Sequence, residues 1–277
     1  MLGIYCVSVN QFNPLECQNE MLWKNQLGNI AKYYLALFPI FFLLGVYISL
    51  IYVRHYREIG KIYAVNLIGS AIGSVAMLGG MYAVHVFYLP AIIFPLLLVP
   101  VFFGVVDQTA KVKKIIVACG LAAFVLAEVY IVFFNTSNFP FYKSITTVLS
   151  VEGSKVVKSK SLPEGYFMVL DDITEFNNTD LSNNYDNLKM GPPPRSLGVY
   201  RDGRRVSSLV SEMPSDYSYL NGALDAFPYV IRTNAKVLLA GTNGGFRIFE
   251  RQHLGAASIF ALEPDPTLYG LVKTDVL

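Results

Sequence analysis

The residues best suited to chemistry lie between Lys236 and Pro266, in the sequence KVLLAGTNGGFRIFERQHLGAASIFALEPDP. KVLLAG predicts a short strand, GTNGG a turn, FRIFERQHLG a helix and SIFALE a second strand that ends at Glu263. Such a unit leaves backbone N–H groups at the start of its helix, where an anionic or polar ligand edge can bind. Glu263 follows the turn by roughly the 20 residues at which a carboxylate accepts hydrogen bonds from ribose hydroxyls. The stretch therefore predicts a nucleotide-type site, with a plain turn between strand and helix as the alternative.

The glycine turn fits an adenosyl donor better than a dinucleotide. The dinucleotide pattern GxGxxG is occupied here by Gly241, Asn243 and Phe246, so its second and third glycines are missing. The GxGxG spacing typical of S-adenosylmethionine sites has one departure, at Asn243, a residue type that tolerates left-handed backbone geometry. Glycines permit the tight turn and the approach of a ligand to the backbone. The predicted donor-binding residues are Gly241, Asn243, Gly244, Gly245 and Glu263.

The chain before Asn135 has the composition of a membrane protein. Apolar residues make up 53% of the chain and charged residues 15%, with a mean hydropathy of +0.43, whereas soluble domains carry about 25% charged residues. Buried helices of a soluble protein are the alternative, but amphipathic alternation is missing. The net charge of +2 is too small to indicate nucleic-acid binding. A bilayer span needs roughly 20 apolar residues. Four stretches approach this length: residues 33–53, 62–84, 87–106 and 115–134.

The second of these stretches carries small residues at helical spacing. Gly69, Gly73 and Gly80 predict a face on which another helix can approach closely in lipid. A pore or substrate path is the alternative. Asn66 and Glu128 are the polar candidates within the membrane, where a carboxylate is costly and functional by default. Glu128 lies near the end of its stretch, so the alternative is that its side chain extends to the membrane–water interface.

The charges of the loops conflict with nucleotide binding by the tail. Basic residues follow the first stretch in RHYREIGK and the third in DQTAKVKK, and both loops are therefore expected in the cytoplasm. Four spans would then leave the tail outside, where an intracellular nucleotide is absent. Residues 1–32 do not have the order of a signal peptide. The sequence leaves the side of the tail open.

The sequence changes character from Phe139 onward. SITTVLSVEG, KVVKSK, GYFMVLDD and SLGVYRDGRRVSSLV predict strands or hairpins, with a turn at Asp202–Gly203. A helix is predicted from about Ser215, with Pro228 beyond its end. HExxH and CxxC spacings are both missing, so we predict no metal site. Cys6 and Cys17 would pair only in an oxidising compartment, and two unrelated thiols are the alternative.

The chain resembles the membrane-bound spermidine synthase-like proteins, in which several membrane helices are fused to an aminopropyltransferase-type domain. The segments QFNPLECQNEMLWKNQ, YYLALFPIFFLLG and REIGKIYAVNLIGSAIGS resemble those of the family's late spans, although an acid is common there at the position of Asn66. VYRDG, DYSYLNGAL, the glycine turn and ALEPDP follow in the family's order. The resemblance implies a bacterial plasma-membrane protein. It also implies S-adenosylmethionine or its decarboxylated form as donor, an amine acceptor and a role in polyamine biosynthesis.

The resemblance also identifies substrate-binding positions and departures from them. Asp202 and Tyr219 match the family's DGxxQ and YHE motifs, whereas Val206, Leu220 and Asn221 replace the glutamine, histidine and glutamate. The family's catalytic aspartate follows later strands than the two present here, so we expect a fragment or decayed gene without turnover. The alternatives are a non-catalytic membrane scaffold with a degenerate nucleotide-binding fold, and a transporter.

The predicted fold is thus a multi-span α-helical membrane domain, then a small β region, then the start of an α/β Rossmann-like domain of the S-adenosylmethionine type. The predicted boundaries are an N-terminal segment (1–32), a transmembrane domain of about four helices (33–135), a β-rich region plus helix (139–232) and an incomplete nucleotide-binding domain (233–277).

Overall fold

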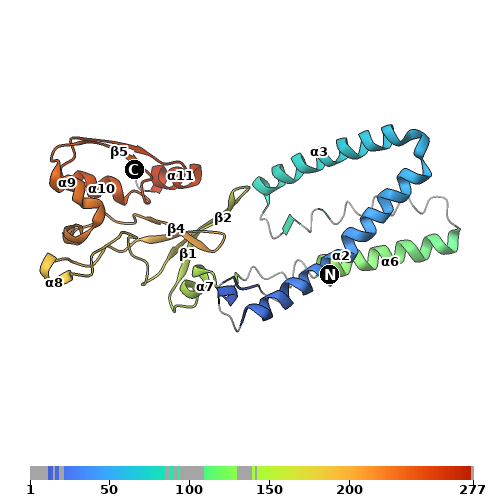
Figure 1. The fold of residues 1–277 in the computed structure, drawn as a ribbon, viewed down its shortest axis with the longest axis horizontal. Helices are drawn as coiled ribbons and strands as arrows, with labels where there is room; N and C mark the ends of the chain where they lie inside the picture. The colour runs from blue at the N-terminus through green and yellow to red at the C-terminus, as the bar shows by residue number, and fades with distance from the viewer. Residues whose placement is uncertain are drawn as a thin grey trace. The chain divides into compact units, whose positions relative to one another are not determined.

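The computed structural model describes residues 12–14, 16–18, 22–84, 88–89, 93, 109–129, 139–140 and 142–275. The chain divides into two compact units (Figure 1). The first comprises residues 1–142 with 161–164, and the second comprises residues 143–160 with 165–277.

The first unit contains long apolar helices. The helices are η1 (Glu16–Gln18), α2 (Trp23–Arg54), η2 (Tyr56–Glu58), α3 (Ile59–Ala83) and α6 (Ala110–Val129). Two of the described helical segments, Trp23–Arg54 and Tyr56–Ala83, are long and apolar enough to cross a membrane. They contain the first predicted span and, up to Ala83, the second. Large apolar side chains such as Tyr34 and Leu35 are mostly exposed along α2, as expected for a surface that lipid solvates.

The other two predicted spans are described only in part. Most of the third, residues 87–106, lies outside the described residues, and the fourth coincides with α6 as far as Val129. Gly69 and Gly73 lie on α3, and a methyl group added at either would meet nothing described within 4 Å. Helix pairing through this face stays a prediction.

The second unit begins with a helix and a four-stranded sheet. These elements are α7 (Ser144–Leu149), β1 (Lys155–Leu162), β2 (Gly165–Asp171), β3 (Leu197–Arg201) and β4 (Arg204–Leu209), and the strand order is β1-β2-β3-β4. β3 pairs antiparallel with both β2 and β4. Leu170, Val199 and Tyr200 are buried in its core. Asp202 and Gly203 have φ values of 51° and 79°, which confirms the predicted tight turn between β3 and β4.

The prediction of a strand at SITTVL was wrong, because these residues form α7. Ile145 and Val148, three residues apart, are both buried on one side of this helix. The Ser144 hydroxyl donates to the Gly203 carbonyl (3.3 Å) and accepts from the Arg205 N–H (3.1 Å). These contacts with the β3–β4 turn outweigh the strand preference of the β-branched residues, which depends strongly on context.

The single helix predicted from Ser215 was also wrong. The chain forms η6 (Ser218–Gly222), η7 (Leu224–Ala226) and α9 (Phe227–Ile231), after a short α8 (Tyr185–Leu188). The Asp216 carboxylate accepts hydrogen bonds from the N–H and hydroxyl of Ser218 (2.8 and 2.7 Å), which favours a turn over a continuous helix. Pro228 lies in the first turn of α9, where its missing N–H costs nothing.

The C-terminal part of the unit has the predicted order of strand, turn, helix and strand. Its elements are β5 (Lys236–Ala240), α10 (Phe246–His253), β6 (Ser258–Leu262) and α11 (Pro266–Asp275). β5 and β6 are parallel, with Leu238 opposite Phe260. Their sheet has two strands among the described residues, so a β-α-β unit is confirmed and a complete doubly wound sheet is not.

Candidate ligand-binding site at the glycine turn

The turn between β5 and α10 follows a left-handed backbone path. The φ values are 86° at Gly241, 47° at Asn243, 61° at Gly244 and 98° at Gly245. Asn243 thus adopts the left-handed backbone geometry that asparagine tolerates better than most residue types. The Gly241 N–H donates to the Leu262 carbonyl (2.8 Å), which holds the turn against the end of β6.

Gly244 packs against β4. A methyl group on Gly244 would lie 1.7 Å from the carbonyl oxygen of Ser208, and the N–H of Val210 donates to the Gly244 carbonyl (3.1 Å). The Asn243 side-chain oxygen accepts from the Ser208 N–H (3.2 Å). This contact could not be predicted from the sequence, because Ser208 and Asn243 are 35 residues apart along the chain. A glycine at position 244 is therefore required by packing, whether or not a ligand approaches it.

The N–H groups at the start of α10 bond within the turn. Those of Gly245 and Arg247 donate to the Thr242 carbonyl (both 3.1 Å), and that of Phe246 donates to the Asn243 carbonyl (3.2 Å). The Phe246 side chain is 0% exposed. A phosphate usually binds to such N–H groups at a helix start. Here these three N–H groups already donate to carbonyl groups of the turn.

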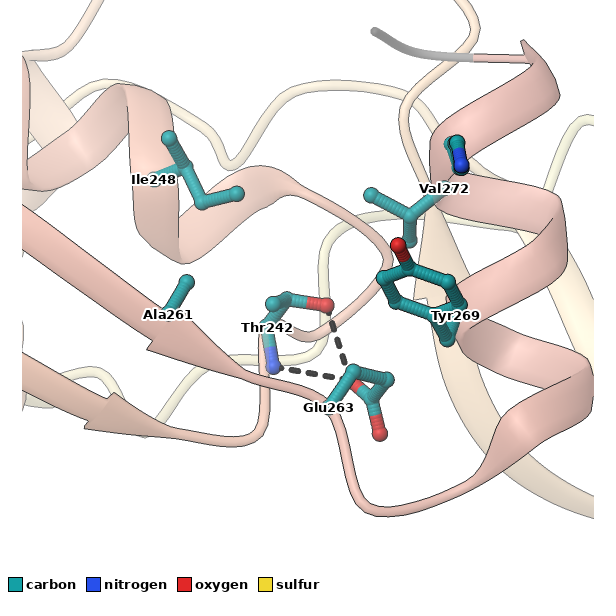
Figure 2. A pocket seen from close by; sticks show the side chains of 7 residues that line it. Thr242, Ile248, Ala261, Glu263, Tyr269 and Val272 are labelled. Carbon is teal, nitrogen blue, oxygen red and sulfur yellow. Dashed lines mark hydrogen bonds between the residues drawn. The ribbon is translucent and has the colours of Figure 1, made fainter.

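Glu263 lies directly after β6 and is bound to the turn. Its Oε2 accepts hydrogen bonds from the N–H and the hydroxyl of Thr242, at 3.0 and 2.8 Å (Figure 2). Its Oε1 accepts a longer one from the N–H of Asp265 (3.4 Å). The carboxylate is thereby fixed at the carboxyl ends of two parallel strands, the place at which open α/β sheets bind ligands.

A cavity of about 450 Å³ lies beside Glu263, within the range usual for small-molecule sites. Figure 2 shows Ile248 on α10, Thr242 and Glu263 at the strand ends, and Tyr269 and Val272 on α11 around it. Sequence reasoning did not find the residues on α11, although Tyr269 and Lys273 stand four apart and so share a helix face. The complete lining is Thr242, Ile248, Ala261, Glu263, Tyr269, Val272 and Lys273.

Tyr219, a predicted substrate-binding residue, belongs to a buried network. Its side chain is 0% exposed, and its hydroxyl donates to the Glu250 carboxylate (3.0 Å). Asn177 donates to the same oxygen (2.8 Å), and Arg251 lies 3.5 Å from the other oxygen. Burial, then the Glu250 charge, raises the pKa of Tyr219 well above its ordinary value. The network joins the loop after β2, η6 and α10.

Asp202, the other predicted substrate-binding residue, lies in the β3–β4 turn. Its carboxylate accepts from the Tyr166 N–H (2.9 Å). Neither Asp202 nor Tyr219 lines the cavity beside Glu263. The structure thus brings Glu263 and the glycine turn together and leaves these two residues elsewhere.

A smaller, polar pocket of about 200 Å³ lies on another side of the glycine turn, at Asn243. It is lined by Asp180, Asp225, Arg247 and Glu250 as well as loop residues 178 and 179. Asp225 forms ion pairs with Arg247 (3.3 Å) and with Arg251 (3.2 Å). The lining therefore carries the three carboxylates of Asp180, Asp225 and Glu250 against the one guanidinium of Arg247, which makes the pocket net acidic.

The residues predicted to act within the membrane are described incompletely. Asn66 is exposed on α3, and the side chain of Glu128 on α6 lies outside what is described. Among the described residues, no three of His, Cys, Asp or Glu are grouped to hold a metal ion. Comparisons with protein-family models, curated proteins and solved structures find no match to this chain.

Proposed function

We propose that the chain binds an adenosyl donor, S-adenosylmethionine or its decarboxylated form, in the cavity beside Glu263. The observation that carries the proposal is the fixed Glu263 carboxylate at the carboxyl ends of β5 and β6. Thr242 orients it through two hydrogen bonds to Oε2. Oε1, with one long bond of 3.4 Å to the Asp265 N–H, keeps capacity to accept from a ribose hydroxyl.

The state of the glycine turn favours a donor without phosphate groups. The N–H groups of Gly245, Phe246 and Arg247, at the helix start where a phosphate would bind, are engaged within the turn, and Gly244 lies against β4. An adenosyl sulfonium compound needs no phosphate site. It needs an acceptor for its ribose and apolar surface for its base, which Glu263 and side chains such as Ile248 and Val272 can provide.

The proposed function is a membrane-anchored transferase of the spermidine synthase-like kind, with an amine as acceptor. α2 and α3 would anchor it in the bacterial plasma membrane, with the tail in the cytoplasm where the donor is made. In this proposal the chain's own residues bind and orient the donor in the cavity beside Glu263.

Isothermal titration of the full chain in lipid nanodiscs tests this proposal. S-adenosylmethionine, its decarboxylated form and methylthioadenosine are titrated, with NAD as a phosphate-bearing comparison. Glu263→Gln keeps the shape and removes the charge, so donor affinity should fall about 10- to 100-fold, the worth of hydrogen bonds to a charged acceptor. Lack of heat with all three adenosyl compounds, from protein whose fold is intact, would sink the proposal.

A second candidate is a non-catalytic scaffold that retains the nucleotide-binding architecture. The burial of Tyr219 favours it, since the one retained residue of the YHE motif serves the interior. Val206, Leu220 and Asn221 replace other family residues. Donor binding without transfer to any of a panel of amines, together with co-purification of one defined partner, would support the scaffold over the transferase.

A further inference from the structure

The cavity beside Glu263 carries charges of opposite sign on two elements. Of the described residues that line it, Glu263 is the one acid and Lys273 the one base. Glu263 directly follows β6, whereas Lys273 lies on α11. A ligand that fills this cavity therefore meets a carboxylate at the strand ends and an ammonium group from the helix.

Tyr269 places the Lys273 ammonium group at the wall of the cavity. The Lys273 Nζ lies 5.8 Å from the centre of the Tyr269 ring, within the roughly 6 Å over which an aromatic face attracts a cation. The two residues are four apart on α11 and so share a helix face. Figure 2 shows the Tyr269 ring between Glu263 and Val272. A ligand that is bound to Glu263 and extends past this ring would bring its far end to Lys273.

S-adenosylmethionine and its decarboxylated form differ in the charge that they would bring to Lys273. Beyond the sulfonium, the side chain of S-adenosylmethionine carries an ammonium group and a carboxylate. The decarboxylated form carries the ammonium group alone, which Lys273 would repel, whereas a carboxylate can form an ion pair with it. A site discriminates between two ligands through such a combination of an attractive contact for one and a repulsive contact for the other.

We propose that Lys273 makes the cavity select a donor with a carboxylate, S-adenosylmethionine, over the decarboxylated form. This inference rests on the proposed function, because it starts from a ribose bound at Glu263. Lys273 pairs with the carboxylate of the donor and thereby determines specificity. Because the Lys273 side chain is exposed, the contribution of the pair is about fivefold in affinity, the upper value for an exposed ion pair.

The test is isothermal titration of the full chain in nanodiscs with donors that differ in one group each. The unchanged chain should bind S-adenosylmethionine more tightly than the decarboxylated form. Lys273→Met should reduce this preference about fivefold, and Lys273→Arg should keep it. S-adenosylhomocysteine, which has the carboxylate but not the sulfonium charge, should lose the same factor in Lys273→Met. Methylthioadenosine, which has neither charge, should bind equally to all variants.

A matched control is Lys236→Met, which removes the same charge from an exposed lysine on β5 outside the lining of the cavity. It should leave all four affinities unchanged. Pulse proteolysis in urea checks that each variant is folded.

The outcomes separate this inference from the proposed function. Equal affinity for S-adenosylmethionine and its decarboxylated form, with methylthioadenosine bound, would overturn the selection and leave donor binding in place. So would a preference that Lys273→Met does not change. If Lys273→Met weakened methylthioadenosine by the same factor, the lysine would act on the shape of the cavity and the charge argument would be wrong. Lack of binding by every adenosyl compound would overturn the proposed function and this inference together.

Discussion

Replacing Gly244 by alanine should destabilise the second unit far more than replacing Gly241 by alanine. Both glycines have positive φ, 61° and 86°, so each alanine incurs about 1–2 kcal/mol of backbone strain. At Gly241 nothing lies within 4 Å of the added methyl group, whereas at Gly244 it would lie 1.7 Å from the Ser208 carbonyl oxygen. The clash involves backbone atoms of β4, which no side-chain rotation relieves.

The magnitude follows from these contacts. Overpacking adds about 1–3 kcal/mol, and loss of the Val210 to Gly244 hydrogen bond adds about 1 kcal/mol. Gly244→Ala should therefore cost roughly 3–6 kcal/mol, against about 1–2 kcal/mol for Gly241→Ala. Both changes restrict the unfolded chain equally, so the difference between them reports the contact with β4.

Pulse proteolysis of the full chain in detergent, over a urea series, measures this difference. The lone tryptophan, Trp23, lies on α2, so fluorescence would not report on the second unit. With a slope of about 1.5 kcal/mol per M urea, Gly244→Ala should unfold roughly 1.3–2.7 M before Gly241→Ala. Equal midpoints for the two variants would refute the packing of the turn on β4.

Three further predictions concern the buried polar groups. Glu250→Ala should lower the free energy of unfolding by about 3 kcal/mol, because Arg251 stays buried beside the lost carboxylate. Glu250→Gln should lower it by less. Equal urea midpoints for the two variants would contradict this prediction. Tyr219→Phe should cost about 2 kcal/mol and leave donor affinity in titration unchanged, whereas a large loss of affinity would return Tyr219 to the binding site. The pKa values of Tyr200 and Tyr219 are raised by burial and then by Glu175 and Glu250, so their contribution to stability is complete below pH about 10 and is lost as pH rises above it. The urea midpoint should fall above that pH, and less steeply when both tyrosines are phenylalanine; parallel curves would count against the raised values.

The parts of the fold that the sequence predicted are those decided locally. β5, α10 and β6 each carry their own periodicity, and the Asp202–Gly203 turn depends on two residues that accept positive φ. α7 was missed because contacts with a turn about 60 residues away along the chain outweigh its own composition. The helix expected from Ser215 was wrong because Asp216 binds the N–H and hydroxyl of Ser218 in a turn, and the chain then forms separate short helices that end at Gly222, Ala226 and Ile231.

The candidate site also has a part that the sequence could predict and a part that depends on contacts between distant residues. The position of Glu263 after β6 follows from strand length and spacing, and the structure places it there. The cavity residues on α11 and the role of Thr242 required knowledge of which side of the turn stays open. Only the fold supplies that knowledge, because β4 covers one side of the turn and residues 242 and 263 meet on another.

This arrangement decides which substitution can test binding. A glycine pattern alone is usually read as a ligand cradle, yet Gly244 is fixed by Ser208 and Asn243 by its hydrogen bonds to Ser208 and Asn177. Loss of binding in a Gly244 variant would therefore report unfolding of the turn. Glu263 differs, because Thr242 holds one of its oxygens and the other keeps capacity for a ligand. Glu263→Gln changes charge without changing packing, so it is the substitution that separates a binding site from an inherited turn.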